Sequence, residues 1–522
     1  MFGEVKDKSF NTGVLGDLVS KGLIEEAKEY VKSYMCKVVE PVGVLLWKPT
    51  TKTVSFYQDK DIKARFIKKY TNGKFDIQKW FFLEDPDNYE QVANVHKGRV
   101  YEDKGQKFVN IFNGYRFTEK KEYKSFDKET RRGVELIWNH VYTVWCSEKE
   151  DQYKYMKQWI CNMISGIKMT TCIYLKGGQG VGKSVMTEFF QDVLGMDAAK
   201  ISANAEIITG KFNASIANKM LLMLEEVPSD TKHKWQTFSN ALKNYVTGKT
   251  VTIEGKGKDE YETENILSIM VISNYSALKL DIDDRRNLVA DISNAKTNLP
   301  KEQKDAYWKP LWKARRSEKV QEAFFWYCIE NADPDFDVFE LPETESKKNI
   351  IIENLKSPAK YFKYMMEHKE KYFEEKEVND EIYYYLYENF PIFYERYDKY
   401  CTKNGFKVHS KQEMGEFIEK DMKFEILTKG GNKRYISIEY NKLHQYFRKK
   451  KWIGEYDEIS EQKNKKISKE EYEYMEEQYE KNEKYLKTMR KQLDLLEKYE
   501  RRNRIEEYDT DDEIDEVIRL LK

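Results

Sequence analysis

The chain has 522 residues, with 90 Lys and Arg against 90 Asp and Glu, so its formal net charge is zero. Hydrophobic residues make up 40% of the chain and aromatic residues 14%, a content that supports packed cores and excludes a wholly disordered protein. The length suggests about three domains. Neutrality excludes a uniformly basic nucleic-acid binder, but it leaves room for a local basic site within a mixed surface.

The first residues and the apolar runs bear on where the protein works. Residues 1–13 lack a basic-then-apolar signal pattern, and runs such as Val42–Trp47 are far shorter than the roughly 20 residues of a membrane-spanning helix. The six cysteines are scattered without a C-x-x-C pair, so we expect neither a disulfide framework nor a zinc site. We therefore expect an intracellular protein in a reducing compartment, with no membrane partner.

Hydrophobic periodicity and composition divide the chain into five predicted segments. They are an N-terminal α+β region (1–130), a helical collar (131–168), an α/β core (169–335), a unit with helices and a hairpin at Phe424–Ile438 (345–455), and a charged helix with an acidic tail (459–522). In the last segment, apolar residues step by three and four, which favours a solvated helix, with a self-associating coiled coil as the alternative.

The strongest motif is a phosphate-binding loop that matches G-x-x-x-x-G-K-[ST] in full. Its residues are Gly177, Gly178, Gln179, Gly180, Val181, Gly182, Lys183 and Ser184. A strand candidate precedes the loop and a helix candidate follows it, which disfavours an ordinary glycine-rich turn. In such a loop backbone N–H groups surround the phosphates, Lys183 reaches the β- and γ-phosphates, and Ser184 holds Mg²⁺. The sequence therefore predicts a site for ATP and Mg²⁺.

Two further strand candidates end in polar side chains that suit such a site. Residues 219–226 form an apolar run that ends in Glu225 and Glu226, and residues 266–273 form another that is followed by Asn274. Strand ends beside a phosphate-binding loop lie at the same sheet edge, so we expect Glu225 on the Mg²⁺ side and Glu226 as polariser of the attacking water. Asn274 is expected to bond the γ-phosphate or that water.

Paired arginines, Arg285 and Arg286, follow these strands. A planar guanidinium suits the spreading charge of a transferred phosphoryl group, so we expect one of them to reach the γ-phosphate of a neighbouring subunit. The alternative is an exposed turn in which the arginines pair with Asp283 and Asp284.

The order and compactness of these motifs resemble superfamily 3 helicases of the AAA+ class, especially the poxvirus and phage/plasmid primase-helicase branch. Residues 177–184 match its motif A, 221–226 its motif B and 271–274 its motif C with Asn274 as the sensor, while Arg285 or Arg286 matches the arginine finger. The resemblance implies an AAA+ P-loop NTPase core, a hexameric ring and 3′→5′ movement on single-stranded DNA.

Between the second and third motifs, residues 241–258 resemble a further motif of this family. The resemblance implies that Lys243 touches the neighbour's nucleotide and that a hairpin over 251–263 projects Lys256 and Lys258 into the central channel. The residues themselves suit two strands with an exposed Gly-Lys-Gly-Lys tip, and lysines there can follow a phosphate backbone. The alternative is a surface hairpin with solvated lysines.

Softer matches to the same branch lie at residues 110–117, Asn139-His140 with Trp159, and 209–213, and no catalytic role is assigned from them. Residues 345–455 resemble a winged-helix domain in architecture only. Many relatives carry a primase, but here only Asp85-Pro-Asp87 with His96 approach its acidic motif. We therefore expect the helicase part without a primase domain.

The sequence predicts an ATP-dependent, ring-forming DNA helicase for viral or mobile-element replication, in the host cell cytoplasm or nucleus. Its expected partners are single-stranded or forked DNA, further copies of the chain in a hexamer, and a separate primase. Two alternatives remain open: a P-loop ATPase that remodels or assembles proteins, and a superfamily 3 helicase acting on RNA. The winged-helix-like unit and the poxvirus-like flanks favour DNA.

Overall fold

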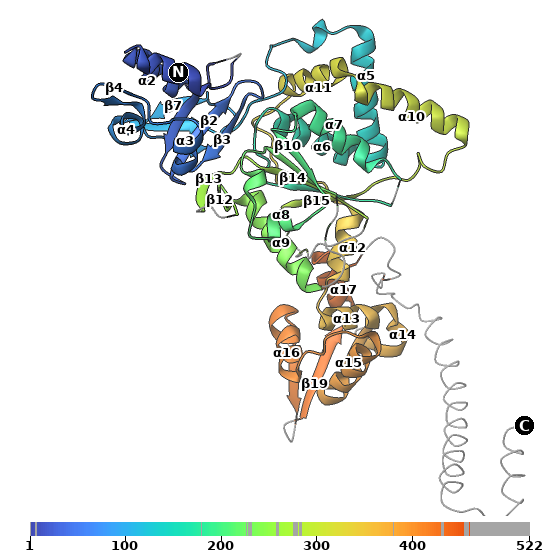
Figure 1. The fold of residues 1–522 in the computed structure, drawn as a ribbon. Coiled ribbons are helices and arrows are strands. Elements are labelled where there is room, and N and C mark those ends of the chain that lie inside the picture. The colour runs from blue at the N-terminus through green and yellow to red at the C-terminus, as the bar shows by residue number, and fades with distance from the viewer. Residues whose placement is uncertain are drawn as a thin grey trace, which may run out of the picture. The chain divides into compact units, whose positions relative to one another are not determined.

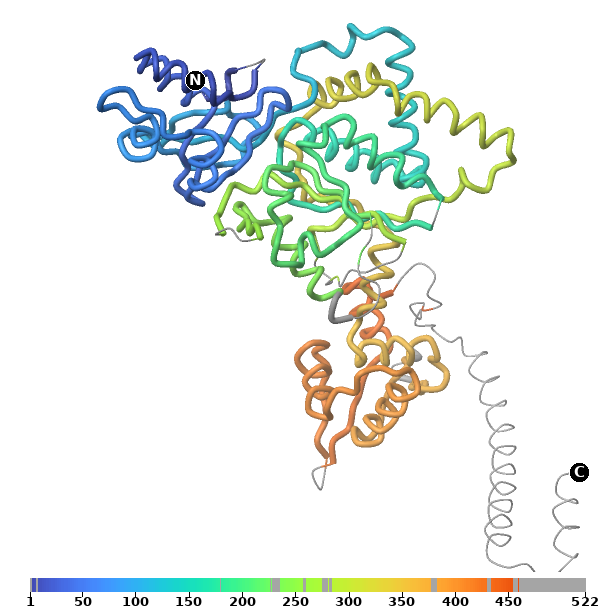
Figure 2. Tube along the Cα trace, viewed as in Figure 1, coloured from blue at the N-terminus to red at the C-terminus, as the bar shows by residue number. Residues whose placement is uncertain are grey.

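The computed structural model separates the chain into two compact units, residues 1–355 and 356–522, which we describe one at a time. Figure 2 follows the chain through both. The structure describes residues 2–5, 8–178, 180–225, 227, 232–256, 260–274, 280, 284–378, 381–429, 433–453 and 459. The predicted site residues Gln179, Glu226 and Lys258 lie outside the described residues, as does the predicted charged helix beyond Ile459.

The N-terminal region, blue in Figure 1, combines short helices with two small three-stranded sheets. Its elements are α1 (Thr12–Ser20), α2 (Ile24–Tyr34), β1 (Met35–Val38), β2 (Gly43–Lys48), β3 (Thr53–Tyr57), α3 (Asp59–Arg65), β4 (Thr71–Asn72), β5 (Phe75–Asp76), α4 (Ile77–Lys79), β6 (Glu90–Val92), β7 (Val100–Asp103) and β8 (Gln106–Asn110). Strands β1, β2 and β3 pair antiparallel, and β2 is the apolar run noted in the sequence, buried along nearly its whole length. In the second sheet β8 lies between β6, which is parallel to it, and β7, which is antiparallel.

Two helices follow, as the apolar spacing predicts: α5 (Lys128–His140), extended by a π-helical turn at Val141–Trp145, and α6 (Glu150–Ile164). Asp127 caps α5 by accepting a hydrogen bond from the Thr130 N–H at 2.8 Å. Helix α5 packs against α10 (Lys301–Arg316) and α11 (Glu318–Glu330), so segments about 170 residues apart in the chain form one helical layer.

The core of the first unit is a five-stranded, fully parallel sheet in a mixed α/β fold. Its strands lie in the order β10 (Ala199–Ser202), β11 (Leu221–Leu224), β14 (Ser268–Ser273), β9 (Cys172–Lys176) and β15 (Asn287–Asp291). Strands β11, β14, β9 and β15 are buried along nearly their whole length, as expected for a parallel sheet covered on both faces, whereas the edge strand β10 is partly exposed. Helix α7 (Lys183–Leu194) packs on β10. Parallel strands bring their carboxyl ends to one edge, and the loop and strand-end motifs meet there.

The remaining elements of this unit lie around the sheet in Figure 1. They are α8 (Glu206–Thr209), α9 (Lys232–Thr247), the antiparallel hairpin β12 (Thr250–Ile253) and β13 (Tyr261–Glu264), and α12 (Glu345–Glu353). Helix α12 packs on β15, where Thr344 bonds the Val289 carbonyl and Ser346 bonds Asp291. These residues therefore belong to the first unit, although the sequence grouped them with segment 345–455.

The second unit packs helices on one face of the antiparallel sheet β16-β17-β19-β18. Its elements are α13 (Ser357–Glu367), α14 (Lys369–Tyr372), β16 (Glu374–Val378), β17 (Glu381–Asn389), α15 (Phe390–Asn404), α16 (Lys411–Glu416), β18 (Ile426–Lys429), β19 (Lys433–Glu439) and α17 (Tyr440–Lys449). Strands β18 and β19 form the predicted hairpin, whose turn at 430–432 lies outside the described residues.

Two properties of the described chain bear on the earlier expectations. All six cysteines are free and buried. Among the described residues, none of the helices has the length and apolar character required to span a bilayer.

Candidate nucleotide-binding site

The phosphate-binding motif forms the turn between β9 and α7. Gly180 and Gly182 have φ angles of 79° and 90°, a left-handed conformation that glycine adopts without steric cost. Gly177 donates its N–H to the Ser273 carbonyl at 3.0 Å, which ties the loop to the end of β14. The loop thus delivers its lysine and serine as the first residues of α7, where helix N–H groups point toward an incoming anion.

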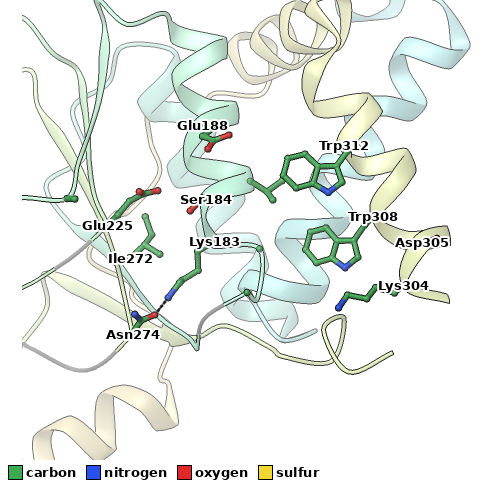
Figure 3. Close-up of a pocket in the computed structure, with 14 residues that line it drawn as sticks. Lys183, Ser184, Glu188, Glu225, Ile272, Asn274, Lys304, Asp305, Trp308 and Trp312 are labelled. Atoms are coloured by element: carbon green, nitrogen blue, oxygen red, sulfur yellow. Dashed lines mark hydrogen bonds between the residues drawn. The ribbon is translucent and has the colours of Figure 1, made fainter. Parts of the chain in front are cut away.

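Lys183 connects the loop to the neighbouring strand. Its ammonium donates to the Gly177 carbonyl at 2.7 Å and to the Asn274 side-chain oxygen, the contact dashed in Figure 3. Burial lowers the pKa of Lys183, and the nearby Glu225 carboxylate opposes that shift. A phosphate oxygen bound here would replace the neutral oxygens of Gly177 and Asn274 as acceptor, and a hydrogen bond between two charged groups is stronger.

Glu225 follows β11 and lies at the same edge. Its backbone N–H bonds the Ser202 carbonyl at 3.0 Å, and its carboxylate accepts from the Thr187 hydroxyl at 2.8 Å. Glu225 and Ser184 line the same cavity, so one carboxylate and one hydroxyl are available as oxygen ligands. This donor set fits Mg²⁺, which binds through one or two protein oxygens, phosphate oxygens and water.

The cavity has a volume of about 780 Å³ and extends well beyond these groups. Its far wall is α10, which contributes Lys304, Asp305, Trp308 and Trp312 (Figure 3). Sequence reasoning missed this wall. The sequence does contain two tryptophans four residues apart in a segment rich in charged residues. The residues around them, however, do not indicate which part of the fold the tryptophans contact.

His140 lies beneath the loop. Its ring is fully buried, Nδ1 shares a hydrogen bond with the Tyr307 hydroxyl at 2.8 Å, and Cε1 lies 3.2 Å from the point where a Cβ on Gly182 would be. Burial lowers the pKa of His140 to about 4, so the ring is neutral near pH 7. His140, to which the sequence assigned no catalytic role, therefore packs against the loop at Gly182.

Arg285 and Arg286 lie at the other edge of the sheet. They precede β15, which runs parallel to β9 with Asn287 opposite Cys172, whereas the phosphate loop begins after Lys176. The four steps from Cys172 to Lys176, at about 3.3 Å each, separate the arginine backbone from the loop by roughly 13 Å. The structure thus does not bring the arginines to the loop of the same chain.

The arginines differ in their surroundings. Arg286 and Lys243 line one small cavity of about 90 Å³, whereas the Arg285 guanidinium lies 5.6 Å from the Phe339 ring centroid. Asp284 pairs with Lys347 at 3.1 Å and caps the start of β15. Among the described residues neither arginine forms an ion pair. Asp284 therefore does not form the salt bridge to an arginine that the alternative of an exposed turn requires.

The β12–β13 hairpin joins the core to the N-terminal region. Lys256 is exposed at its tip, while Thr263 at its base is buried and accepts the Ala93 N–H at 3.2 Å. The Asn94 amide donates to Glu264 at 3.0 Å. The predicted strands are therefore present. Ala93 and Asn94, which follow β6 of the N-terminal region, bond the base of the hairpin.

Asn213, from a segment given no role in the sequence, fastens the other strand. Its side chain is buried, donates to the Thr252 carbonyl at 2.8 Å and accepts the Glu254 N–H at 2.8 Å. The Asn213 amide thus bonds a backbone carbonyl and a backbone N–H of the same segment, as a paired β-strand would. It holds the end of β12 at the point where the pairing with β13 stops.

Comparisons with known proteins place this geometry in context. A family model described as a family of unknown function (DUF5906) matches residues 175–286, the span that holds the loop, the strand-end acids, the hairpin and the arginines. The DNA primase-polymerase of Nitratiruptor phage NrS-1 is 22% identical over 201 residues, which is 38% of this chain and 27% of that protein. The match thus spans well under two thirds of the relative's length.

Solved structures add a likeness in fold. An apo structure of the NrS-1 C-terminal region aligns with a TM-score of 0.51 and 16% identity, covering 80% of this chain and 98% of that one. A second apo structure of that region, residues 305–718 in its own chain, aligns with the same TM-score and coverage. Residues 175–286 therefore match the DUF5906 family model, and the chain resembles the C-terminal region of the NrS-1 phage primase-polymerase in fold.

Proposed function

We infer that this protein is an ATP-driven helicase of the superfamily 3, AAA+ type that forms a ring and translocates on single-stranded DNA during phage or viral replication. One observation carries the proposal. Lys183, Ser184, Glu225 and Asn274 surround one cavity at the carboxyl edge of the sheet, while Arg286 and Lys243 meet at another site near the opposite edge. A neighbour in a ring can supply what each chain cannot supply to itself.

In this proposal ATP binds at the loop as substrate. Lys183 and the loop N–H groups hold the phosphates, and Asn274 passes from bonding the lysine to orienting the γ-phosphate or the attacking water. Ser184 and Glu225 would hold Mg²⁺, which would neutralise phosphate charge. Glu226 keeps its predicted role as polariser of the water, and the guanidinium of Arg286 from a neighbouring chain stabilises the charge of the transition state.

The exposed Lys256 favours nucleic acid over a protein substrate. Thr263 holds the hairpin at its base and Asn213 holds the tip-side end of β12, so the exposed lysine is carried on a hairpin that is fastened at both ends. Together with Lys258, the tip would contact the phosphate backbone of one strand in the ring channel. The name of the NrS-1 relative, a DNA primase-polymerase, supports DNA rather than RNA as the partner.

The test combines ATP hydrolysis with strand displacement on forked DNA. We expect single-stranded DNA to raise turnover, particle size to increase with ATP, and Lys183→Ala to abolish hydrolysis. Lys256→Ala with Lys258→Ala should remove the DNA stimulation. Unchanged stimulation in that double variant would refute the hairpin assignment, and stimulation by RNA alone would favour the RNA-directed alternative.

A further inference from the structure

One face of α10 forms a wall opposite the phosphate loop. Lys304, Trp308 and Trp312 follow one another at four-residue spacing, which places them on a single face of the helix. All three line the cavity of about 780 Å³ that also contains Lys183 and Asn274. Large aromatic side chains at a half-buried, solvent-accessible wall call for a ligand that covers them.

Trp308 is fixed in place. Its indole N–H donates to the Lys296 carbonyl at 3.1 Å, and its ring edge lies 2.4 Å from the point where a Cβ on Gly182 would be. The ring therefore contacts the loop backbone directly, with only a glycine at position 182 allowing this approach. The indole ring of Trp308 thus lies beside the first turn of α7.

Trp312 is positioned through arginines. The guanidinium groups of Arg315 and Arg316 each lie 5.4 Å from its ring centroid, and Arg315 also bonds the Val185 carbonyl at 3.2 Å and the Glu188 carboxylate. These contacts fasten α10 to α7 beside the cavity. The aromatic wall is thus tied to the helix that follows the phosphate loop.

The loop chemistry decides which part of a nucleotide reaches this wall. Lys183 marks the β- and γ-phosphate end, and Figure 3 shows it pointing toward Asn274, away from the two tryptophans. The nucleoside leaves the opposite end of the phosphate chain. The cavity continues there along Val185, Glu188 and Trp312, and its volume is in the usual range for sites that enclose a whole nucleotide-sized ligand.

We propose that Trp308 and Trp312 form the nucleobase platform of this site and bind a purine by its ring face. The inference rests on the proposed function and adds the residues that hold the base. Stacking uses the aromatic area of both partners, so the two-ring purine gains more from the indoles than a pyrimidine does. The site is therefore expected to prefer purine nucleotides over pyrimidine nucleotides and over phosphate chains without a base.

The experiment compares ADP, UDP and pyrophosphate, each with Mg²⁺, by titration calorimetry of the full chain. Wild-type protein should bind ADP most tightly, UDP less tightly and pyrophosphate weakest. Trp312→Ala should weaken ADP by about tenfold while leaving pyrophosphate unchanged, and Trp312→Phe should recover most of the loss. Lys313→Ala is the matched control, because that lysine lies on the same helix in an exposed pair with Glu129.

Trp308→Ala is the second variant. An equal loss of ADP and pyrophosphate affinity would assign Trp308 to supporting Gly182 and overturn its place in the platform. An unchanged ratio of ADP to pyrophosphate affinity in both alanine variants would overturn the inference while leaving the phosphate site intact. If the wild-type protein bound neither ADP nor pyrophosphate, the nucleotide site and the proposed function would both be overturned.

Discussion

Mixed rings provide the sharpest prediction about the arginines. Lys183→Ala chains lack the loop ammonium but keep their arginines, and Arg286→Ala chains lack one arginine but keep their loop. If Arg286 acts on the neighbouring chain, an equal mixture of these two inactive variants should regain hydrolysis. With random mixing, about a quarter of the interfaces pair an intact loop with an intact arginine, so turnover should approach about a quarter of the wild-type value.

The structure supplies the magnitudes. If a guanidinium lay as far from the γ-phosphate as the Arg286 backbone lies from the loop, roughly 13 Å, its charge at an effective dielectric constant of about 20 would contribute about 1 kcal/mol, which is less than tenfold in rate. An arginine in contact with the transferred group contributes on the order of 10³-fold or more. A loss far above tenfold in Arg286→Ala therefore requires contact, and within one chain the register of β15 against β9 prevents that contact.

The assay is steady-state ATP hydrolysis of the pre-mixed variants with saturating single-stranded DNA, together with particle size. Arg285→Ala is the matched control, because its guanidinium lies over Phe339 and not in the cavity shared with Lys243. It should retain most of the wild-type turnover. If the mixture stays as inactive as each variant alone while rings still form, the reasoning from strand register is refuted.

Three further outcomes follow from the loop and its support. Asn274→Ala should lower the turnover number by at least about tenfold while changing nucleotide affinity less, because in the proposed function its amide acts on the transferred phosphate. Steady-state hydrolysis measures the turnover number and calorimetry measures the affinity. Gly182→Ala places a Cβ 2.4 Å from Trp308 at a φ of 90° and should abolish nucleotide binding. Gly178→Ala should be tolerated, because no atom of the described part of the chain beyond its neighbours lies within 4 Å of the new Cβ. His140 has a folded-state pKa of about 4 against 6.5 when unfolded, so the unfolded chain takes up the extra proton and stability should fall between pH 6.5 and 4 by roughly 3 kcal/mol; His140→Asn should flatten that part of the pH–stability curve in thermal melts.

The phosphate loop and the strand ends were accessible to sequence reasoning because their signals are local. A glycine-rich turn between a strand and a helix, and acids or amides at the ends of apolar runs, are read within about ten residues. The parallel sheet then follows from the rule that such strand ends share an edge. The structure brings Lys183, Asn274 and Glu225 to one cavity for this reason.

The rest depends on contacts between distant segments. Trp308 lies more than a hundred residues beyond Gly182 in the chain, and their contact depends on how α10 packs across α7, for which neither helix carries a local signal. Asn213 resembles any polar loop residue until the hairpin beside it is known. The opposite placement of Arg286 depends on the direction of β15, which the order of motifs alone does not reveal.

The direction of β15 has a consequence for how the protein responds to its own concentration. If Arg286 acts on the neighbouring chain as proposed, each chain holds halves of two separate sites, and hydrolysis per chain should increase as chains associate and cease on dilution well before the fold is lost. ATP hydrolysis would then be confined to places where many copies of the chain gather. Under the proposed function, the threshold for unwinding DNA would then be set by how much of this protein has been made.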